Sequence, residues 1–136
     1  MAELYGREHV ERYRATGGEE GHYWREALVL LLTTTGRKSG EKRTTPLLYG
    51  RSGDDVVLIA SNGGAPAHPP WYLNLKANPE VEVQIKGETF QSRARDASPE
   101  ERPRLWRTMA GYYPPYDEYQ RRTEREIPVV VLERVD

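Results

Sequence analysis

The stretch LLLTTTGRKSGEKRTTPLLYG, from Leu30 to Gly50, decides the fold of this chain. Apolar and β-branched residues lead into and out of a short loop that contains glycine. This pattern is typical of two antiparallel strands joined by a turn, because parallel neighbours need a long crossover. The turn carries four cations: Arg37, Lys38, Lys42 and Arg43. It is therefore either a hairpin tip that holds an anion or an ordinary solvated basic turn.

The composition limits the classes of function. The chain has 136 residues, which suits one domain with a single core, and a net charge of −1, so any anion site must be local. It has no cysteine and no convincing cluster of metal ligands. The longest apolar run is too short to cross a bilayer. The cations are not interleaved with tyrosines, which disfavours nucleic acid as a partner. We therefore expect a soluble, cytoplasmic protein without a metal.

Short strands and peripheral helices make up the rest of the chain. Helices are predicted over 7–15, after the proline-rich loop that ends at Pro70, after the capping pattern Ser98 to Glu101, and after Pro115. Six strands are expected, and the first three should form an antiparallel meander because their loops are short. The six segments are ALVLLLTTT, TTPLLYG, VVLIAS, VEVQIKGE, TFQSRAR and IPVVVLERV.

The expected fold is α+β and mainly β. Six mostly antiparallel strands would leave two long apolar edges open, so we expect the sheet to close into a small barrel with peripheral helices. A doubly wound dinucleotide-binding fold is disfavoured because the G-x-G-x-x-G motif is absent. We divide the chain into an N-terminal helical segment, residues 1–26, and a barrel domain, residues 27–136.

Two regions hold candidate ligand-binding residues, and each also has a structural interpretation. Ser61 ends a strand, where its hydroxyl bonds either to backbone or to a ligand. Trp71 begins a helix and is either core or the wall of a pocket. Tyr113, Tyr116 and Tyr119 recur every three residues, as a core stripe does. The proline break before them and the polar residues around them fit a lid over a cleft better.

Two further side chains are not assigned to the site. His68 titrates in the right range for a general acid, but it lies between loop prolines without a carboxylate nearby in sequence. We interpret it as a surface residue. The direction of the Tyr112 side chain is not fixed by the sequence.

Four segments together resemble the deazaflavin-dependent nitroreductase family: LLLTTTGRKSGEKRTTPLLYG, IASNGGAPAHPPWYLNLKANPEVEVQI, ARDASPEER and YYPPYDEYQRRTEREIPVVVLE. The resemblance runs from Leu28 to Glu133, with the motifs in the family's order. It implies an FMN-binding split-barrel-like fold for residues 27–136. It also implies coenzyme F420, an 8-hydroxy-5-deazaflavin, as the cofactor and reduction of quinones and nitro compounds as the reaction. No metal is implied.

The resemblance also implies roles for individual residues. Arg37, Lys38 and Arg43 match the family's phosphate-contacting positions, whereas Lys42 is expected to be only a surface residue. Some relatives carry a lysine where this chain has Asn62, so one cation near the cofactor is missing. The remaining cofactor contacts implied are Pro46, Leu47, Ala60, Ser61, Asn62 and Trp71. The catalytic residues implied are Tyr113, Tyr116, Tyr119 and again Ser61.

We therefore expect an F420H2-dependent oxidoreductase that transfers a hydride to a quinone, with nitroaromatic and nitroimidazole compounds as further acceptors. The alternatives are an FMN-binding split-barrel oxidoreductase and a non-catalytic deazaflavin-binding protein. The expected state is a monomer or weak dimer. Ordinary solvation of the N-terminal helix is favoured over a peripheral contact with the inner face of the cell membrane, because its apolar face is thin.

Overall fold

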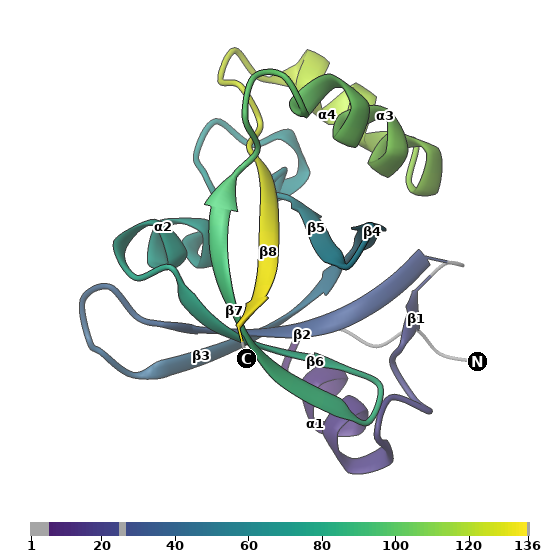
Figure 1. The fold of residues 1–136 in the computed structure, drawn as a ribbon, viewed down its shortest axis with the longest axis vertical. Helices are drawn as coiled ribbons and strands as arrows, with labels where there is room; N and C mark the ends of the chain where they lie inside the picture. The colour runs from purple at the N-terminus through teal and green to yellow at the C-terminus, as the bar shows by residue number, and fades with distance from the viewer. Residues whose placement is uncertain (1–5, 25–26, 136) are drawn as a thin grey trace.

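The computed structural model describes residues 6–24 and 27–135, which form a curved antiparallel sheet with four α-helices around it (Figure 1). The helices are α1 (Gly6–Thr16), α2 (Pro70–Ala77), α3 (Arg102–Tyr112) and α4 (Pro115–Arg122), with a 3₁₀ turn, η1 (Asn62–Gly64). The strands are β1 (Tyr23–Trp24), β2 (Ala27–Thr35), β3 (Lys42–Leu48), β4 (Gly50–Ser52), β5 (Asp55–Ile59), β6 (Glu80–Ile85), β7 (Glu88–Asp96) and β8 (Val129–Val135). The α+β class, the mostly antiparallel sheet and the peripheral helices are confirmed.

The hairpin at the centre of the sequence prediction is present. β2 pairs antiparallel with β3 from Val29 opposite Leu48 to Thr35 opposite Lys42. Successive residues of β2 point to opposite faces of the sheet, and both faces are largely buried. Leu30 and Leu32 point into the main core, whereas Val29 and Leu31 pack beneath α1.

The predicted meander is wrong. β3 and β5 do not pair; β5 lies between β4 and β8, so the sheet runs β3–β2–β6–β7–β8–β5–β4, with β1 beside the start of β2. β4 and β1 are two strands that the sequence reading missed, because three and two residues are too few to show a period. Among the described residues no ladder joins β3 to β5, so hydrogen bonds do not close the sheet, and the expected closure into a barrel is wrong in this respect.

The sheet curves around one core and carries α3 and α4 on its outer face. The side chains of β5 alternate between two faces, as those of β2 do. Val56 and Leu58 enter the main core, and Val57 and Ile59 meet the outer cluster that contains Leu105, Met109, Tyr116, Ile127, Val129 and Val131. These contacts hold α3 and α4 at the end of β5 where the loop 60–69 begins (Figure 1).

Helix α1 docks on the sheet through two apolar residues. Val10 and Tyr13 are buried against Val29 and Leu31, and the Tyr13 hydroxyl accepts a hydrogen bond of 2.7 Å from the backbone N–H of Lys86. Burial raises the pKa of Tyr13 to about 12. The helix predicted over 7–15 is confirmed. The proposed boundary between segments 1–26 and 27–136 stays a prediction.

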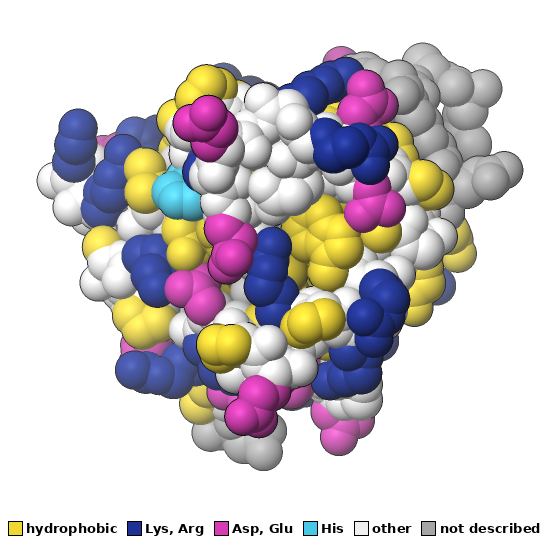
Figure 2. Space-filling view, turned by 90° about the horizontal axis from the view of Figure 1, so that it is seen from above, with side chains coloured by type: hydrophobic (Ala, Val, Ile, Leu, Met, Phe, Trp, Pro, Cys, Tyr) yellow, Lys and Arg dark blue, Asp and Glu magenta, His cyan; other side chains and the backbone are white. Residues whose placement is uncertain are grey.

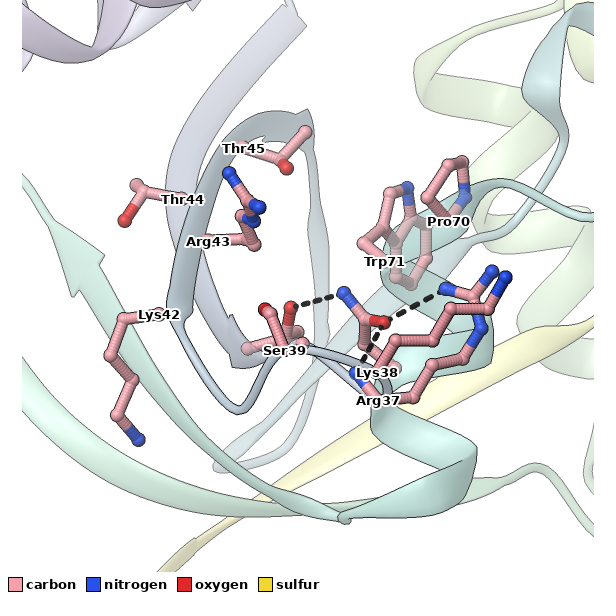
Figure 3. A pocket seen from close by; sticks show the side chains of 12 residues that line it. Arg37, Lys38, Ser39, Lys42, Arg43, Thr44, Thr45, Pro70 and Trp71 are labelled. Carbon is pink, nitrogen blue, oxygen red and sulfur yellow. Dashed lines mark hydrogen bonds between the residues drawn. The ribbon is translucent and has the colours of Figure 1, made fainter.

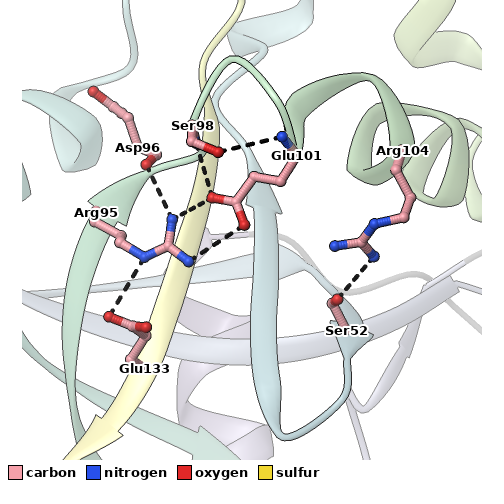
Figure 4. A network of polar contacts seen from close by, with 7 residues as sticks. All are labelled: Ser52, Arg95, Asp96, Ser98, Glu101, Arg104 and Glu133. Atoms are coloured by element: carbon pink, nitrogen blue, oxygen red, sulfur yellow. Dashed lines mark hydrogen bonds and ion pairs between the residues drawn. The ribbon is translucent and has the colours of Figure 1, made fainter.

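The capping pattern before α3 forms as expected, one turn ahead of the helix. The Ser98 N–H donates to the Glu101 carboxylate at 2.8 Å, and the Glu101 N–H donates to Ser98 Oγ at 3.3 Å. Glu101 also bonds the guanidinium of Arg95 on β7, which in turn pairs with Glu133 on β8 (Figure 4). These contacts tie the start of α3 to two strands.

Candidate functional site

The basic hairpin tip borders an open cavity of about 570 Å³ (Figure 3). The turn is tightened by hydrogen bonds from Gly36 N to Glu41 O and from Gly40 N to Gly36 O. Gly40 has a φ of +74°, a conformation that favours glycine. The lining residues are Thr34, Gly36, Arg37, Lys38, Ser39, Lys42, Arg43, Thr44, Thr45, Pro70, Trp71 and Asn74. All four cations of the turn therefore border one cavity.

Asn74 orients the first of these cations. It is buried on α2, and its Oδ1 accepts hydrogen bonds from the Arg37 backbone N–H at 3.1 Å and from the Arg37 guanidinium at 2.9 Å. Its Nδ2 donates to Thr34 Oγ1 at 3.2 Å. Sequence reasoning missed Asn74 because this asparagine is 37 residues from its partner and sits in a short helix that otherwise looks like core.

The other three cations differ in how they are held. No described residue bonds the Lys38 ammonium, which leaves its donors available. Arg43 pairs with Glu41 at 3.5 Å, but both side chains are largely exposed. Lys42 donates to Thr35 Oγ1 at 3.0 Å and points away from Trp71 (Figure 3). Arg37, Lys38 and Arg43 thus have the more suitable positions for an anion on the Trp71 side.

A second, more apolar cavity of about 490 Å³ continues from the first. The two share Thr45, Pro70 and Trp71 as walls. The remaining lining residues of the second cavity are Leu47, Leu48, Ile59, Ser61, Asn62, Gly63, Pro69, Tyr113, Tyr116 and Tyr119. One continuous groove therefore has a cationic end at the hairpin and a phenolic end beneath α4. Trp71, which is 7% exposed, is both core and wall.

The three predicted tyrosines form a single aromatic group. The ring centroids of Tyr113 and Tyr116 are 5.0 Å apart, and both lie 6.4 Å from that of Tyr119. The Tyr113 and Tyr119 hydroxyls are 3.4 Å apart. The Tyr116 hydroxyl has no hydrogen bond to any described residue. Burial, with lesser effects from the two neighbouring phenols, raises the Tyr116 pKa well above its ordinary value, so this phenol stays protonated. Tyr112, by contrast, is exposed and lines neither cavity.

The loop after β5 forms the wall opposite the tyrosines. Asn62, at a φ of +47°, donates from Nδ2 to Ala67 O at 3.0 Å. Gly64 has a φ of +81°, and a Cβ there would lie 2.8 Å from the Tyr119 carbonyl oxygen. Only glycine allows the loop to approach α4 this closely. Two predicted residues do not line the groove: Ala60 is fully buried, and Pro46 lies in β3 opposite Leu31.

His68 is not a free surface side chain, in contrast to the sequence interpretation. It is partly buried, its ring lies 4.8 Å from that of Tyr72, and its Nδ1 accepts a hydrogen bond of 3.0 Å from Arg125. Burial and the nearby Arg125 charge lower the pKa of His68 from its ordinary value. The partner, Arg125, lies 57 residues away in the chain, so no local signal could reveal it.

Comparison with known proteins places the chain in a family. The model of the family described as F420H(2)-dependent quinone reductase matches residues 4–134. The chain belongs to this family.

Relatives of known sequence and structure support the assignment. An F420H(2)-dependent quinone reductase of Mycobacterium tuberculosis is 45% identical over 130 residues, which are 93% of this chain and 87% of the relative. A structure described as an F420-H2 dependent reductase (FDR-A) is 45% identical, has a TM-score of 0.72, and is matched over 77% of this chain and 93% of its own. A structure described as a domain-swapped dimer is 42% identical, has a TM-score of 0.75, and is matched over 93% of this chain and 96% of its own.

Two further observations bear on this member of the quinone reductase family. Among residues 6–24 and 27–135 there is no group of three or more His, Cys, Asp or Glu side chains able to hold a metal. Within the same part of the chain, no helix is long and apolar enough to span a membrane.

Proposed function

We propose that this protein is an F420H2-dependent quinone reductase whose groove holds the coenzyme with its anionic tail at the hairpin and its ring beneath the tyrosines. The single observation that carries the proposal is the sharing of Thr45, Pro70 and Trp71 by the two cavities. A ligand with a charged end and a flat aromatic end matches this polarity. Membership of the family supplies the identity of that ligand.

The donor set at the hairpin fits the coenzyme's phosphodiester and glutamate tail. Arg37 is pre-oriented by Asn74, which lowers the entropy lost when its guanidinium binds an anion. Lys38 and Arg43 add a mobile ammonium and a second guanidinium. Lys42 is not assigned a role, because its side chain points away from Trp71 and bonds Thr35 on the neighbouring strand.

The opposite end of the groove fits a planar ring and an acceptor. We assign Trp71 and Leu47 to the walls of the ring, and Ser61 and Asn62 to its edge. Pro46 and Ala60 act only as backbone support, since neither lines the groove. The cofactor supplies the hydride when bound. The chain itself supplies position, exclusion of water and hydrogen-bond donors.

Tyr116 is the side chain best placed to donate to the acceptor. Its hydroxyl is unpartnered among the described residues, it lines the groove, and it remains protonated at all working pH values. A donor aimed at the oxygen on which charge develops stabilises the transition state more than the ground state. Tyr113, Tyr119 and Ser61 complete the set of hydroxyls around the acceptor. No nucleophile or metal is required for hydride transfer.

The finer parts of the proposal concern acceptors and fold. Quinones are the main acceptors, and nitroaromatic and nitroimidazole compounds are secondary ones, since their oxygens offer the same hydrogen-bond acceptors to the phenols. We take the unpaired seam between β3 and β5, whose residues line the second cavity, as support for the proposal that the fold is a split barrel.

We do not extend the proposal to a membrane contact through α1. Its apolar residues Val10 and Tyr13 face the sheet, and its exposed residues are mostly charged. The face that carries α3 and α4, at the other end of the molecule from α1, mixes Lys and Arg with Asp and Glu around a central apolar area (Figure 2). Such a face lacks the single-sign charge that favours anionic lipid. A monomer or weak dimer remains our proposal for the assembly, to be checked by light scattering.

The test is turnover of the reduced coenzyme. We expect menadione-dependent oxidation of F420H2, measured as the return of the oxidised coenzyme's absorbance. We also expect coenzyme fluorescence to be quenched on binding. FMN in place of the coenzyme should neither bind tightly nor support turnover. Tight coenzyme binding without turnover would instead show a carrier protein, and tight FMN binding would show the alternative cofactor.

A further inference from the structure

Arg125 lies beneath the Ser61 loop and makes four hydrogen bonds to it. Its Nη2 donates to Ser61 O at 2.7 Å, its Nε to Ala65 O at 2.9 Å, and its Nη1 to both Ala60 O at 3.3 Å and His68 Nδ1 at 3.0 Å. Two of these acceptors belong to Ser61 and the residue before it. One guanidinium therefore ties residues 60, 61, 65 and 68 of this loop together.

The geometry of these contacts requires an arginine. A guanidinium presents five N–H donors in a fixed planar fork, whereas a lysine ammonium is a single point with three donors. No carboxylate of a described residue forms an ion pair with Arg125, so carbonyl oxygens and an imidazole nitrogen solvate its charge. The side chain is thus used for its shape and donors.

The backbone of Arg125 is fixed to the opposite wall of the groove. Gln120, on α4, donates from Nε2 to the Arg125 carbonyl oxygen at 2.8 Å, and its Oε1 accepts from the Ile127 N–H at 2.9 Å. The same helix carries Tyr116 and Tyr119. Arg125 is therefore held by the tyrosine wall and itself holds the Ser61 wall.

We propose that Arg125 is a positioning residue that sets the spacing between the Ser61 loop and the tyrosines of α4, and so sets the turnover of the acceptor without touching it. This inference rests on the proposed function for its kinetic part. Its structural part, the clamping of residues 60–68 to α4, is independent of any ligand. An error of about 1 Å in placing a reacting group can cost on the order of 100-fold in rate, so a small change of spacing is sufficient.

The first experiment is hydrogen exchange of the ligand-free, full-length protein. Arg125→Lys and Arg125→Met are compared with Arg121→Met, a matched control at an exposed position of α4 for which no hydrogen bond or ion pair is found. We expect faster exchange at residues 60–68 and 113–122 in both Arg125 variants, with unchanged exchange in β2, β6 and β7. Exchange like that of wild type in both variants would overturn the proposal.

The second experiment separates acceptor turnover from coenzyme binding. We expect kcat with menadione to fall about tenfold or more in Arg125→Lys and Arg125→Met, on the scale set by misplacement of reacting groups. The Kd for the oxidised coenzyme should rise by a smaller factor than kcat falls, since Arg125 does not contact the cationic end of the groove that is proposed to hold the tail. Lysine should not rescue turnover, whereas millimolar guanidinium should partly restore kcat in Arg125→Ala. Equal losses of coenzyme affinity and kcat in the Arg125 variants would contradict a positioning role for Arg125. Wild-type kcat in Arg125→Lys would contradict it as well.

A second variant covers the case in which the Arg125 variants do not fold. Gln120→Leu leaves the guanidinium in place but removes its tie to α4, and we expect the same exchange pattern with a smaller loss of kcat. Normal exchange in Gln120→Leu would again reject the proposal. If wild-type protein does not turn over F420H2, the proposed function fails, but the exchange comparison still decides the role of Arg125.

Discussion

Asn74 and Arg37 are joined by two hydrogen bonds that end on the same oxygen: the side-chain amide oxygen of Asn74 accepts both the backbone N–H and the guanidinium of Arg37. The pair ties α2 to the tip of the β2–β3 hairpin. It fixes the direction of the only cation in that turn that is bonded to a buried side chain among the described residues.

The first prediction concerns this pair. Asn74→Ala frees the Arg37 side chain and removes the bond to its N–H, so we expect the coenzyme Kd to rise about tenfold, the equivalent of about 1.4 kcal/mol. Asn78→Ala is the matched control, because Asn78 ends the same helix, is exposed and lines neither part of the groove. Fluorescence titration measures both. An unchanged Kd in Asn74→Ala would mean that Arg37 binds equally well without orientation.

The second prediction compares two lysines of the same turn. Lys38→Ala should weaken coenzyme binding, and the weakening should decrease at high salt because the contact is with a phosphate or carboxylate. Lys42→Ala should change the Kd by less than about twofold, the scale of an exposed charge that points elsewhere. Titrations at low and high salt measure both variants. A larger effect of Lys42→Ala than of Lys38→Ala would reverse the assignment.

The third prediction concerns the unpartnered phenol. Tyr116→Phe should lower kcat with menadione by about 2- to 13-fold, the loss of one hydrogen bond of about 0.5–1.5 kcal/mol, while the coenzyme Kd stays constant. Since burial keeps the Tyr116 pKa above its ordinary value, the wild-type rate should show no loss from its ionisation up to pH 10. Tyr112→Phe, at an exposed position, is the control. Stopped-flow kinetics up to pH 10 measures both quantities. An unchanged kcat in Tyr116→Phe, or a wild-type rate that falls below pH 10 through ionisation of Tyr116, would contradict the prediction.

The fourth prediction concerns the docking of α1. Tyr13→Phe leaves the ring in place but deprives the Lys86 N–H of its acceptor, so we expect a loss of about 1–3 kcal/mol in the free energy of unfolding. Tyr23→Phe, where the side chain is 63% exposed, should be neutral. Urea denaturation measures both. Equal stability of the two variants would show that the Lys86 N–H finds another partner.

The fifth prediction concerns pH. The Arg95 guanidinium and the Ser98 N–H hold the pKa of Glu101 at about 2, below its ordinary 4.5. A lowered carboxylate pKa stabilises the fold above the unfolded value, and this contribution is lost as the pH falls through 4.5 towards 2. Glu101→Gln should therefore be less stable than wild type at pH 7 and equal to it near pH 2. Glu124→Gln, an exposed control, should match wild type throughout in denaturant titrations.

The elements that sequence could predict are those with a strong local pattern. The alternation of Val81, Val83 and Ile85 and the capping pair Ser98 and Glu101 are local, and the structure confirms both. The pairing partner of β5 is not local. Any buried strand satisfies the same apolar pattern, so the sequence could not show that β5 pairs with β8 instead of β3.

The same distinction applies to the site. Arg37, Lys38, Arg43 and the tyrosines could be named because their residue types are unusual for their surroundings and match a family motif. Asn74 and Arg125 could not, because each acts through partners 37 or more residues away in the chain. The roles of these two side chains follow from hydrogen-bond partners that only folding brings close to them.

The unpaired seam between β3 and β5 has a consequence for how this protein family can diversify. The walls of the second cavity there are side chains of Leu47, Leu48 and Ile59, and no backbone ladder crosses between the two strands. The width of the opening is therefore set by the bulk of a few residues. We expect substitutions among them to change the size of acceptor that the proposed site admits while every interstrand bond of the sheet is kept.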